Sequence, residues 1–286
     1  MHYINTPLGG FYVRRIFYLT AFWLFLICFF TLTMTWMAYT IRYNRQLNRE
    51  KAVYQSLQSD VLSYDNQMDH PVHDMSPKSD SVSTKKDDTA AIPDVDFKTL
   101  QKKNPDIYAW ILIPGTSVSY PVLQHPTDNS YYLHHNVDGS AGYPGCIFSE
   151  NTNQKDFSDS PTVLYGHNMR NGTMFGALHA LDTIDFSTGS HFIYIITPDA
   201  GICYQIVTTA VTDNQNILSV CQKADNGLMH FLTRIQMHCS GKTAHALIQN
   251  TSDNARPLLI LSTCGSRRQS RFLVLAIKQN EWRKPY

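Results

Sequence analysis

The chain has 286 residues and nearly balanced charge, with 24 Lys and Arg against 23 Asp and Glu, for a formal net charge of +1. Apolar residues make up 43% of the chain and charged residues 16%, which indicates a globular protein rather than a disordered one. The chain has no excess of basic residues of the kind that binds nucleic acid, so we expect no nucleic-acid partner. The length suits one sizeable domain with additional segments.

An uncharged apolar segment lies close to the N-terminus, at residues 16–40. As a helix rising ~1.5 Å per residue, it is long enough to cross a hydrocarbon core of ~30 Å. A cleaved signal peptide is the alternative, but its apolar region is usually shorter and an A-x-A-like site follows it. We therefore expect a cytoplasmic tail at residues 1–15 and a single-pass membrane anchor at 16–40, embedded in membrane lipid.

Two segments of different composition lie between the anchor and the main domain. Residues 41–66 show apolar positions three, four or seven residues apart, which predicts a juxtamembrane helix. Residues 67–94 are rich in Asp, Ser and Lys and predict a flexible linker. The domain at 95–286 follows, and a long C-terminal domain after such an anchor is expected outside the cell.

Residues 95–286 have a mainly β pattern. Short runs rich in β-branched and aromatic residues alternate with Gly, Pro, Asn and Asp. About eight such strands favour a closed barrel or a sandwich. The expected strands are Trp110–Ile113, Val118–Leu123, Cys146–Ser149, Thr162–Tyr165, Phe192–Thr197, Cys203–Val211, Ala244–Gln249, Leu258–Thr263 and Phe272–Ile277. One amphipathic helix is expected around residues 228–235.

Cys264 is the candidate nucleophile among six cysteines, none of which forms a C-x-x-C pair. It ends the apolar strand "RPLLILSTC", and the basic stretch "GSRRQSR" follows it. A strand end places the thiol at a rim, and neighbouring guanidinium groups favour the reactive thiolate. The four cysteines outside the apolar segment and this site are expected to be reduced and mostly buried: Cys146, Cys203, Cys221 and Cys239.

His167 is the best candidate for the base that a cysteine nucleophile needs near neutral pH. It directly follows an expected strand and a glycine, which places it at a rim beside a turn. The neighbours His134 and His135 suggest a metal pair, but they lack H-x-x-x-H spacing and a carboxylate partner. We expect neither a metal nor a cofactor.

Several strings, in chain order, resemble class B sortases. "YGHNMRNGTMF" resembles the histidine motif of that family, and "LSTC" followed by "RFLVLA" resembles its cysteine and arginine strands. "DNSYYL" and "GCIF" resemble segments further upstream, so the resemblance extends over residues 97–277. Two departures are present. Ile260 stands where the T-L-x-T-C string begins with Thr, and a shorter loop leaves Arg267 and Arg268 as alternatives to Arg271.

The resemblance implies a closed sortase-type β-barrel with a few helices and a cysteine transpeptidase activity. Cys264 would form a thioester with the sorting motif of a secreted protein, His167 would act as acid and base, and Arg271 would stabilise the oxyanion. The motif would be of the N-P-x-T-N or a related type. The acceptor would be an amine of a peptidoglycan precursor or a pilin lysine. By position, the substrate-binding residues would be Asn129, Leu133 and Ser262.

Three other readings of the sequence compete with wall anchoring. A pilin-polymerising sortase has the same chemistry with a different acceptor amine. An L,D-transpeptidase would place histidine beside cysteine in an S-H-G-C-like string, which "LSTCGSRR" does not contain. A membrane-anchored binding module without catalysis would not need His167, Cys264 and Arg271 together.

Overall fold

A computed structural model describes most of the chain in two compact units, one ending at Ala52 and the other running from Val53 to Tyr286. The described residues are 8–63, 92–184, 186, 189, 191–223, 226–236, 256–265 and 269–284. Several expectations lie outside the described residues: most of the 67–94 linker, the Ala244–Gln249 strand, Cys239, Arg267 and Arg268.

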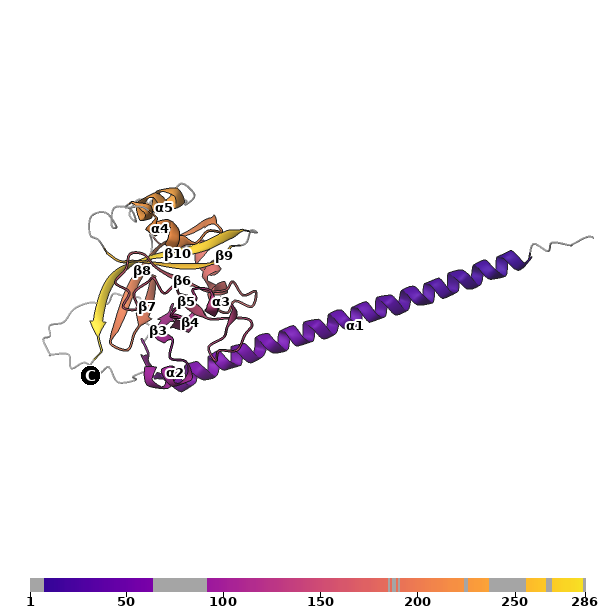
Figure 1. Cartoon of the computed structure of the whole chain (residues 1–286), viewed down its shortest axis with the longest axis horizontal. Helices are drawn as coiled ribbons and strands as arrows, with labels where there is room; N and C mark the ends of the chain where they lie inside the picture. The colour runs from indigo at the N-terminus through magenta and orange to yellow at the C-terminus, as the bar shows by residue number, and fades with distance from the viewer. Residues whose placement is uncertain are drawn as a thin grey trace, which may run out of the picture. The chain divides into compact units, whose positions relative to one another are not determined.

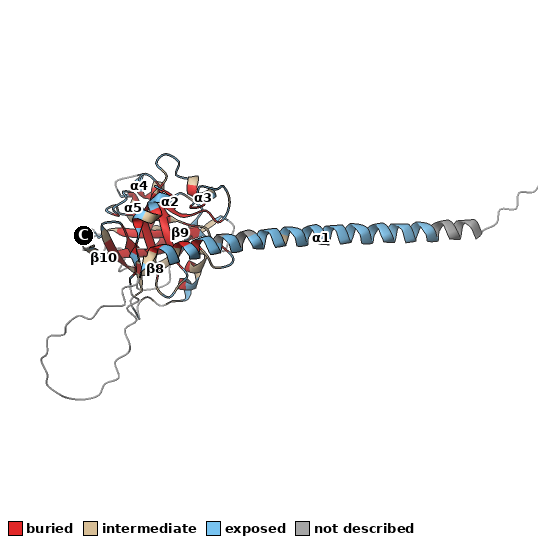
Figure 2. Cartoon of the chain, turned by 90° about the horizontal axis from the view of Figure 1, so that it is seen from below, coloured by how far each residue is buried: buried red, intermediate tan, exposed pale blue. Residues whose placement is uncertain are grey.

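The first unit contains the greater part of one long helix, α1 (Leu8–Val61). The helix continues without a break from the apolar segment into the stretch expected to form a separate juxtamembrane helix. Within the described residues, Arg15–Arg45 is the one helical stretch long and apolar enough to cross a membrane. Its large apolar side chains are exposed, as the pale blue of α1 in Figure 2 shows. The predicted apolar N-terminal helix is therefore confirmed.

The second unit begins with the last turns of α1. There Tyr54, Leu57 and Val61 are buried. The chain then enters a two-stranded antiparallel sheet, in which β1 (Leu62–Ser63) pairs with β2 (Asp94–Val95). This compact unit therefore includes the end of α1 as well as the barrel.

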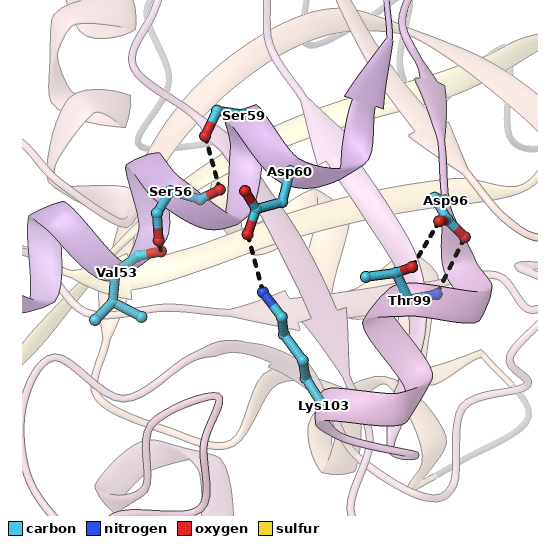
Figure 3. Close-up of polar contacts among 7 residues, drawn as sticks. All are labelled: Val53, Ser56, Ser59, Asp60, Asp96, Thr99 and Lys103. Atoms are coloured by element: carbon cyan, nitrogen blue, oxygen red, sulfur yellow. Dashed lines mark hydrogen bonds and ion pairs between the residues drawn. The ribbon is translucent and has the colours of Figure 1, made fainter.

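Figure 3 shows the polar contacts around this junction. The side chain of Asp96 accepts a hydrogen bond from the Thr99 amide at the start of α2 (Phe97–Lys103), which caps this helix. Lys103 at the other end of α2 forms a 3.3 Å ion pair with Asp60 of α1. Because that ion pair is exposed, its stabilising effect is small, and the buried apolar residues dominate this junction.

Eight strands of the second unit close into a barrel, in the order β10-β8-β7-β3-β4-β5-β6-β9 (Figure 1). Neighbouring strands are antiparallel except for the parallel pairs β4–β5 and β6–β9. Closure leaves no free edge strand, which suits short apolar strands. The bounds are β3 (Ile107–Leu112), β4 (Ser119–Leu123), β5 (Ile147–Ser149), β6 (Thr162–Tyr165), β7 (Phe192–Ile196), β8 (Ala200–Asp213), β9 (Leu258–Cys264) and β10 (Ser270–Arg283). The predicted closed barrel is confirmed.

The helices are few and short beside the barrel. They are α3 (Tyr131–His134), the 3₁₀ helix η1 (Phe175–Thr183), α4 (Ile217–Gln222) and α5 (Gly227–Gln236). Of these, α5 is the amphipathic helix expected around residues 228–235. Strands β8 and β10, with 14 residues each, extend well beyond their expected bounds.

One outer face of the barrel carries a second apolar cluster beneath α4 and α5. Alternate residues of β9 and β10, including Leu258, Ile260, Leu273 and Leu275, pack there with Phe231 of α5. Side chains of a strand alternate between its two faces. The side chains of Ser262 and Cys264 therefore continue the same outer face toward the end of β9.

Candidate active site

Cys264 and Arg271 form the last residue pair before the turn that joins β9 and β10. The Gly265 amide donates to the Ser270 carbonyl at 2.8 Å, so the 264–271 pair is of the non-hydrogen-bonded type, in which side chains lie closest. The Arg271 Nη1 lies 4.0 Å from the Cys264 Sγ. The Cys264 side chain is exposed, which leaves the thiol accessible at the rim.

Ser262 lies two residues before the nucleophile candidate, on the same strand face. Its side chain is fully buried, and its hydroxyl has no hydrogen-bond partner within the described part of the chain. The position therefore fits the expected substrate-side hydroxyl by its face and its free hydrogen-bonding capacity, although its burial keeps it from open solvent.

His167 follows β6 by two residues and lies beside the end of β9, because β6 and β9 are parallel neighbours with Tyr165 opposite Ser262. The residue before it, Gly166, has little room for a side chain. A Cβ on Gly166 would lie 2.5 Å from the Ile147 Cδ1 and 2.8 Å from the Phe175 ring. The close approach of these two side chains explains the Gly-His pair in the motif.

The orientation of the His167 ring follows from one hydrogen bond. Its Nε2 lies 2.8 Å from the carbonyl oxygen of Leu133 in α3. A carbonyl oxygen only accepts, so Nε2 carries a proton and donates it. The nitrogen left to exchange protons in the neutral ring is Nδ1. The backbone carbonyl of Leu133 thus orients the His167 ring, whereas the Leu133 side chain is half-buried.

The environment of His167 favours its neutral form. Burial of the imidazole is the main cause that lowers its pKa, and the nearby positive charges of His134 and Arg271 lower it further. The hydrogen bond to Leu133 acts in the opposite direction and raises the pKa. On the solvent side, the Tyr143 ring lies 4.9 Å from the His167 ring, and 54% of the Tyr143 surface is exposed.

Asn129 lies in the loop before α3 and is occupied by contacts within the protein. Its Oδ1 accepts a hydrogen bond from the Asn151 amide at 2.8 Å, and its Nδ2 lies 3.4 Å from the Glu150 Oε2. It forms no hydrogen bond with His167, Cys264 or Arg271. The structure thus places His167, Cys264 and Arg271 at one rim, with Leu133 and Ser262 next to them. Asn129 instead forms hydrogen bonds with a neighbouring loop.

Two residues near the thiol were not expected from the sequence. The Cys264 carbonyl accepts a hydrogen bond from the Asn168 Nδ2 at 2.9 Å and another from the His179 Nε2 at 3.2 Å. Asn168 could have been suspected from the sequence, because it directly follows His167. His179 is one histidine among twelve, and nothing in its local string marks it out.

The remaining described cysteines outside the apolar segment are buried, as the sequence predicts: Cys146, Cys203 and Cys221. Cys203 and Cys221 are also free thiols. Burial raises the pKa of the Cys203 thiol and raises that of Cys221 to about 12, so both are poor nucleophiles. Cys264 is therefore the accessible thiol of the described barrel.

Comparison with known proteins agrees with this geometry. The family model described as "Sortase domain" matches residues 111–279, which is more than half of the chain. The chain belongs to the sortase family. Sortases are cysteine transpeptidases, and the matched region contains His167, Cys264 and Arg271.

The relatives that this sortase resembles include class B enzymes. Sortase B of Listeria monocytogenes is 42% identical over 91 residues, which are 32% of this chain. The chain spans between 33% and 37% of the length of the curated relatives that it matches. The structure of Clostridium perfringens sortase B is 26% identical with a TM-score of 0.55, and the match covers 65% of this chain and 100% of that one.

A third comparison includes a substrate complex. The structure titled as a Staphylococcus aureus sortase B–substrate complex is 26% identical with a TM-score of 0.51. The match covers 64% of this chain and 84% of that chain. The class B resemblance predicted from the motifs is thus confirmed by both sequence and fold.

Proposed function

We propose that this sortase cleaves the C-terminal sorting motif of secreted proteins and transfers them to an amine of the cell wall. Cys264 is the nucleophile, His167 the acid and base, and Arg271 the oxyanion donor. The observation that carries the proposal is the pairing of the exposed Cys264 thiol with the Arg271 guanidinium at 4.0 Å. The parallel β6–β9 pair adds His167 to the same rim.

The first step forms a thioester. The Cys264 thiolate attacks the carbonyl carbon of the scissile peptide, and the carbonyl electrons move to the oxygen. The Arg271 guanidinium stabilises this oxyanion, because its donors are fixed where negative charge develops. The C–N bond then breaks, and the leaving amine takes a proton from the Nδ1 of His167 in its imidazolium form.

The second step transfers the acyl group. An acceptor amine attacks the thioester carbon and gives a proton to the Nδ1 of His167. The C–S bond breaks, Cys264 leaves as thiolate, and a new amide bond forms. Atoms and charge balance without a metal or a cofactor. No hydrogen bond joins the thiol to the imidazole, both of which lie in the described rim, so we propose that the substrate amine connects them.

We propose a sorting motif of the N-P-x-T-N or a related type, bound at the rim where the outer face of β9, covered by α4 and α5 at its other end, reaches Cys264. Ser262 supports this through its place on that face and its hydroxyl without a partner. Leu133 supports it through its backbone contact with His167. Asn129 is retained as a binding residue on the family resemblance. Its amide would have to exchange its contacts with Glu150 and Asn151 for contacts with the peptide.

We propose that the first unit anchors the enzyme in the cell membrane as a single-pass helix, with the barrel outside the cell. Support comes from the length and apolar composition of Arg15–Arg45 and from its exposed apolar side chains. An extracellular barrel would meet secreted clients and wall precursors on the same side of the membrane.

A ligation assay tests the proposed function. The full chain in detergent is incubated with peptides that carry candidate sorting motifs, together with a peptidoglycan-precursor amine or a lysine peptide from a pilin. Mass spectrometry then measures amide products against a Cys264→Ala control. The proposal predicts a product with the wall amine that the control does not form. Products with the lysine peptide alone would favour pilus assembly, and a folded enzyme without any product would favour a binding module.

A further inference from the structure

The parallel ladder between β6 and β9 ends before it reaches the nucleophile. Its last main-chain hydrogen bond runs from the Gly166 amide to the Ser262 carbonyl at 3.2 Å. Because Cys264 is in a non-hydrogen-bonded pair with Arg271, its own carbonyl points away from β10 and toward β6. The chain beyond Gly166 has already left the strand, so no backbone amide of β6 faces that carbonyl.

Two side chains occupy this place. The Asn168 Nδ2 and the His179 Nε2 both donate to the Cys264 carbonyl, at 2.9 Å and 3.2 Å. A carbonyl oxygen has two lone pairs, so the two donors fill its accepting capacity. These two side-chain donors continue the hydrogen bonding between β6 and β9 as far as Cys264, the residue that carries the thiol.

Asn168 connects the nucleophile directly to the catalytic base. It is the residue after His167, and it pairs with Met174 in an isolated bridge. The Phe175 amide donates to the His167 carbonyl at 3.0 Å, which closes the loop between them. The hydrogen bond that Asn168 donates therefore ties the Cys264 peptide directly to the segment that carries His167, in addition to the bond between the Gly166 amide and the Ser262 carbonyl.

His179 connects the nucleophile to the arginine strand. Its ring stacks on Phe272, with centroids 4.4 Å apart and planes at 30°. Phe272 follows Arg271 in β10, and neighbouring side chains of a strand point to opposite faces. His179 therefore contacts the hairpin from the face opposite to the thiol and the guanidinium. It does not reach the reacting atoms.

We propose that Asn168 and His179 are positioning residues that hold the Cys264 peptide in register with His167 and Arg271. Strand register sets the spacing of these residues; Asn168 then fixes the Cys264 peptide to the segment of His167, and His179 fixes it against Phe272, the neighbour of Arg271. The effect of these two residues on catalysis rests on the proposed transpeptidase function. Their effect on the position of the Cys264 thiol does not. The two can therefore be tested separately.

The test uses the full chain with two variants that each remove one donor. Asn168→Ala removes the amide, and His179→Phe keeps a ring on Phe272 but removes the N–H. Arg170→Ala, an exposed change in the same loop, is the matched control. Asn168→Ser and His179→Gln retain a donor and serve as rescue variants. If one donor-free variant fails to fold, the other donor-free variant carries the test. Circular dichroism and the unfolding midpoint check the fold of each.

The first measurement is the rate of Cys264 alkylation by iodoacetamide at fixed pH, which needs no substrate. Loosening the Cys264 peptide moves the thiol away from the Arg271 guanidinium, which lies 4.0 Å from it, and cysteines next to a cation are in general more reactive, so both donor-free variants should react several-fold more slowly. The rescue variants should recover part of the rate, and Arg170→Ala should match the wild type. Equal rates in all variants would overturn the inference.

The second measurement is acylation by a sorting peptide. Misplacement of a reacting group by about 1 Å can cost on the order of a hundredfold in rate, so kcat should fall by about tenfold to a hundredfold. KM should stay unchanged, because both side chains spend their hydrogen bonds on the carbonyl of Cys264 within the protein. A change in KM alone would contradict a positioning role. Slower alkylation in the variants, with no acylation even in the wild type, would support the inference and refute the proposed function.

Discussion

Arg271 lies directly across the β9–β10 hairpin from Cys264, with its Nη1 4.0 Å from the Sγ. A hairpin of fixed register holds these two side chains on one face, so the cation and the nucleophile need no loop movement to meet.

Replacing Arg271 should remove oxyanion stabilisation. Loss of one such donor typically costs about 10²–10³ in kcat, so Arg271→Ala should slow acylation by that factor. Arg271→Lys should recover only part of the rate, because an ammonium lacks the planar fork of a guanidinium. Single-turnover mass spectrometry of the acyl-enzyme measures both. Arg256→Ala, an exposed change near the other end of β9, is the control. An Arg271→Ala enzyme as fast as this control would refute the role.

The pKa of His167 should respond to the charge of His134. Burial is the main cause of its lowered pKa, and the charge of His134 adds to it, so His134→Gln should raise the pKa of His167. NMR titration of the histidine side chains measures the change, with His230→Gln on α5 as the control. Because the imidazolium is the proton donor in the first step, the alkaline limb of the pH–rate profile should move upward with it. A downward shift would contradict this account.

The same lowered pKa makes stability depend on pH. The unfolded chain binds more protons on its histidine than the folded chain between the folded pKa and the ordinary value near ~6.5. The contribution of His167 to stability is therefore present above that window and lost as the pH falls through it. Unfolding midpoints of wild type and His167→Gln, compared across this window, should converge as the pH is lowered.

The last turns of α1 should stabilise the barrel unit. Leu57 has only 2% of its surface exposed, so Leu57→Ala leaves a cavity and should lower the free energy of unfolding by about 2–5 kcal/mol. Val53 lies on the same helix with 40% of its surface exposed, and Val53→Ala should change it by less than about 0.5 kcal/mol. Denaturant unfolding of residues 53–286 measures both. Equal effects would mean that this helix end does not belong to the cooperative unit.

Gly166 should resist substitution because of its neighbours. The Cβ of Gly166→Ala would lie 2.5 Å from the Ile147 Cδ1, so side chains must shift, and overpacking typically costs about 1–3 kcal/mol. The shift would also displace His167 and slow acylation. Adding Ile147→Val removes the clashing methyl and should restore part of the stability, while the contact with Phe175 remains. Thermal unfolding of the single and double variants tests this, and the absence of any rescue would count against it.

The sequence predicted those features that depend on local patterns. Alternating apolar strands and turn residues predicted the barrel, and β6 was predicted with its observed bounds at Thr162–Tyr165. Cys264 was recognisable because it ends an apolar strand next to arginines. His167 was recognisable because it follows a strand and a glycine. Each of these signals lies within about ten residues of the chain, where propensity and periodicity are informative.

Features that depend on strand register could not be predicted in this way. The parallel β6–β9 pair brings His167 to Cys264 across almost one hundred residues of sequence, and no local pattern encodes it. His179 reaches the Cys264 carbonyl only because η1 folds over that end of the barrel. The burial of Leu57 and Val61 could not be predicted either, because an amphipathic helix end does not indicate which surface packs against it.

The central claim is that Cys264 forms a thioester with a sorting motif, and mapping that adduct tests it most directly. The full chain is mixed with sorting-motif peptides without an amine acceptor, acid-quenched, digested and sequenced by tandem mass spectrometry. The account predicts an acyl mass on the peptide that contains Cys264, lost after treatment with hydroxylamine and absent from Cys264→Ala. An adduct on another residue, or amide product formed by Cys264→Ala, would contradict it.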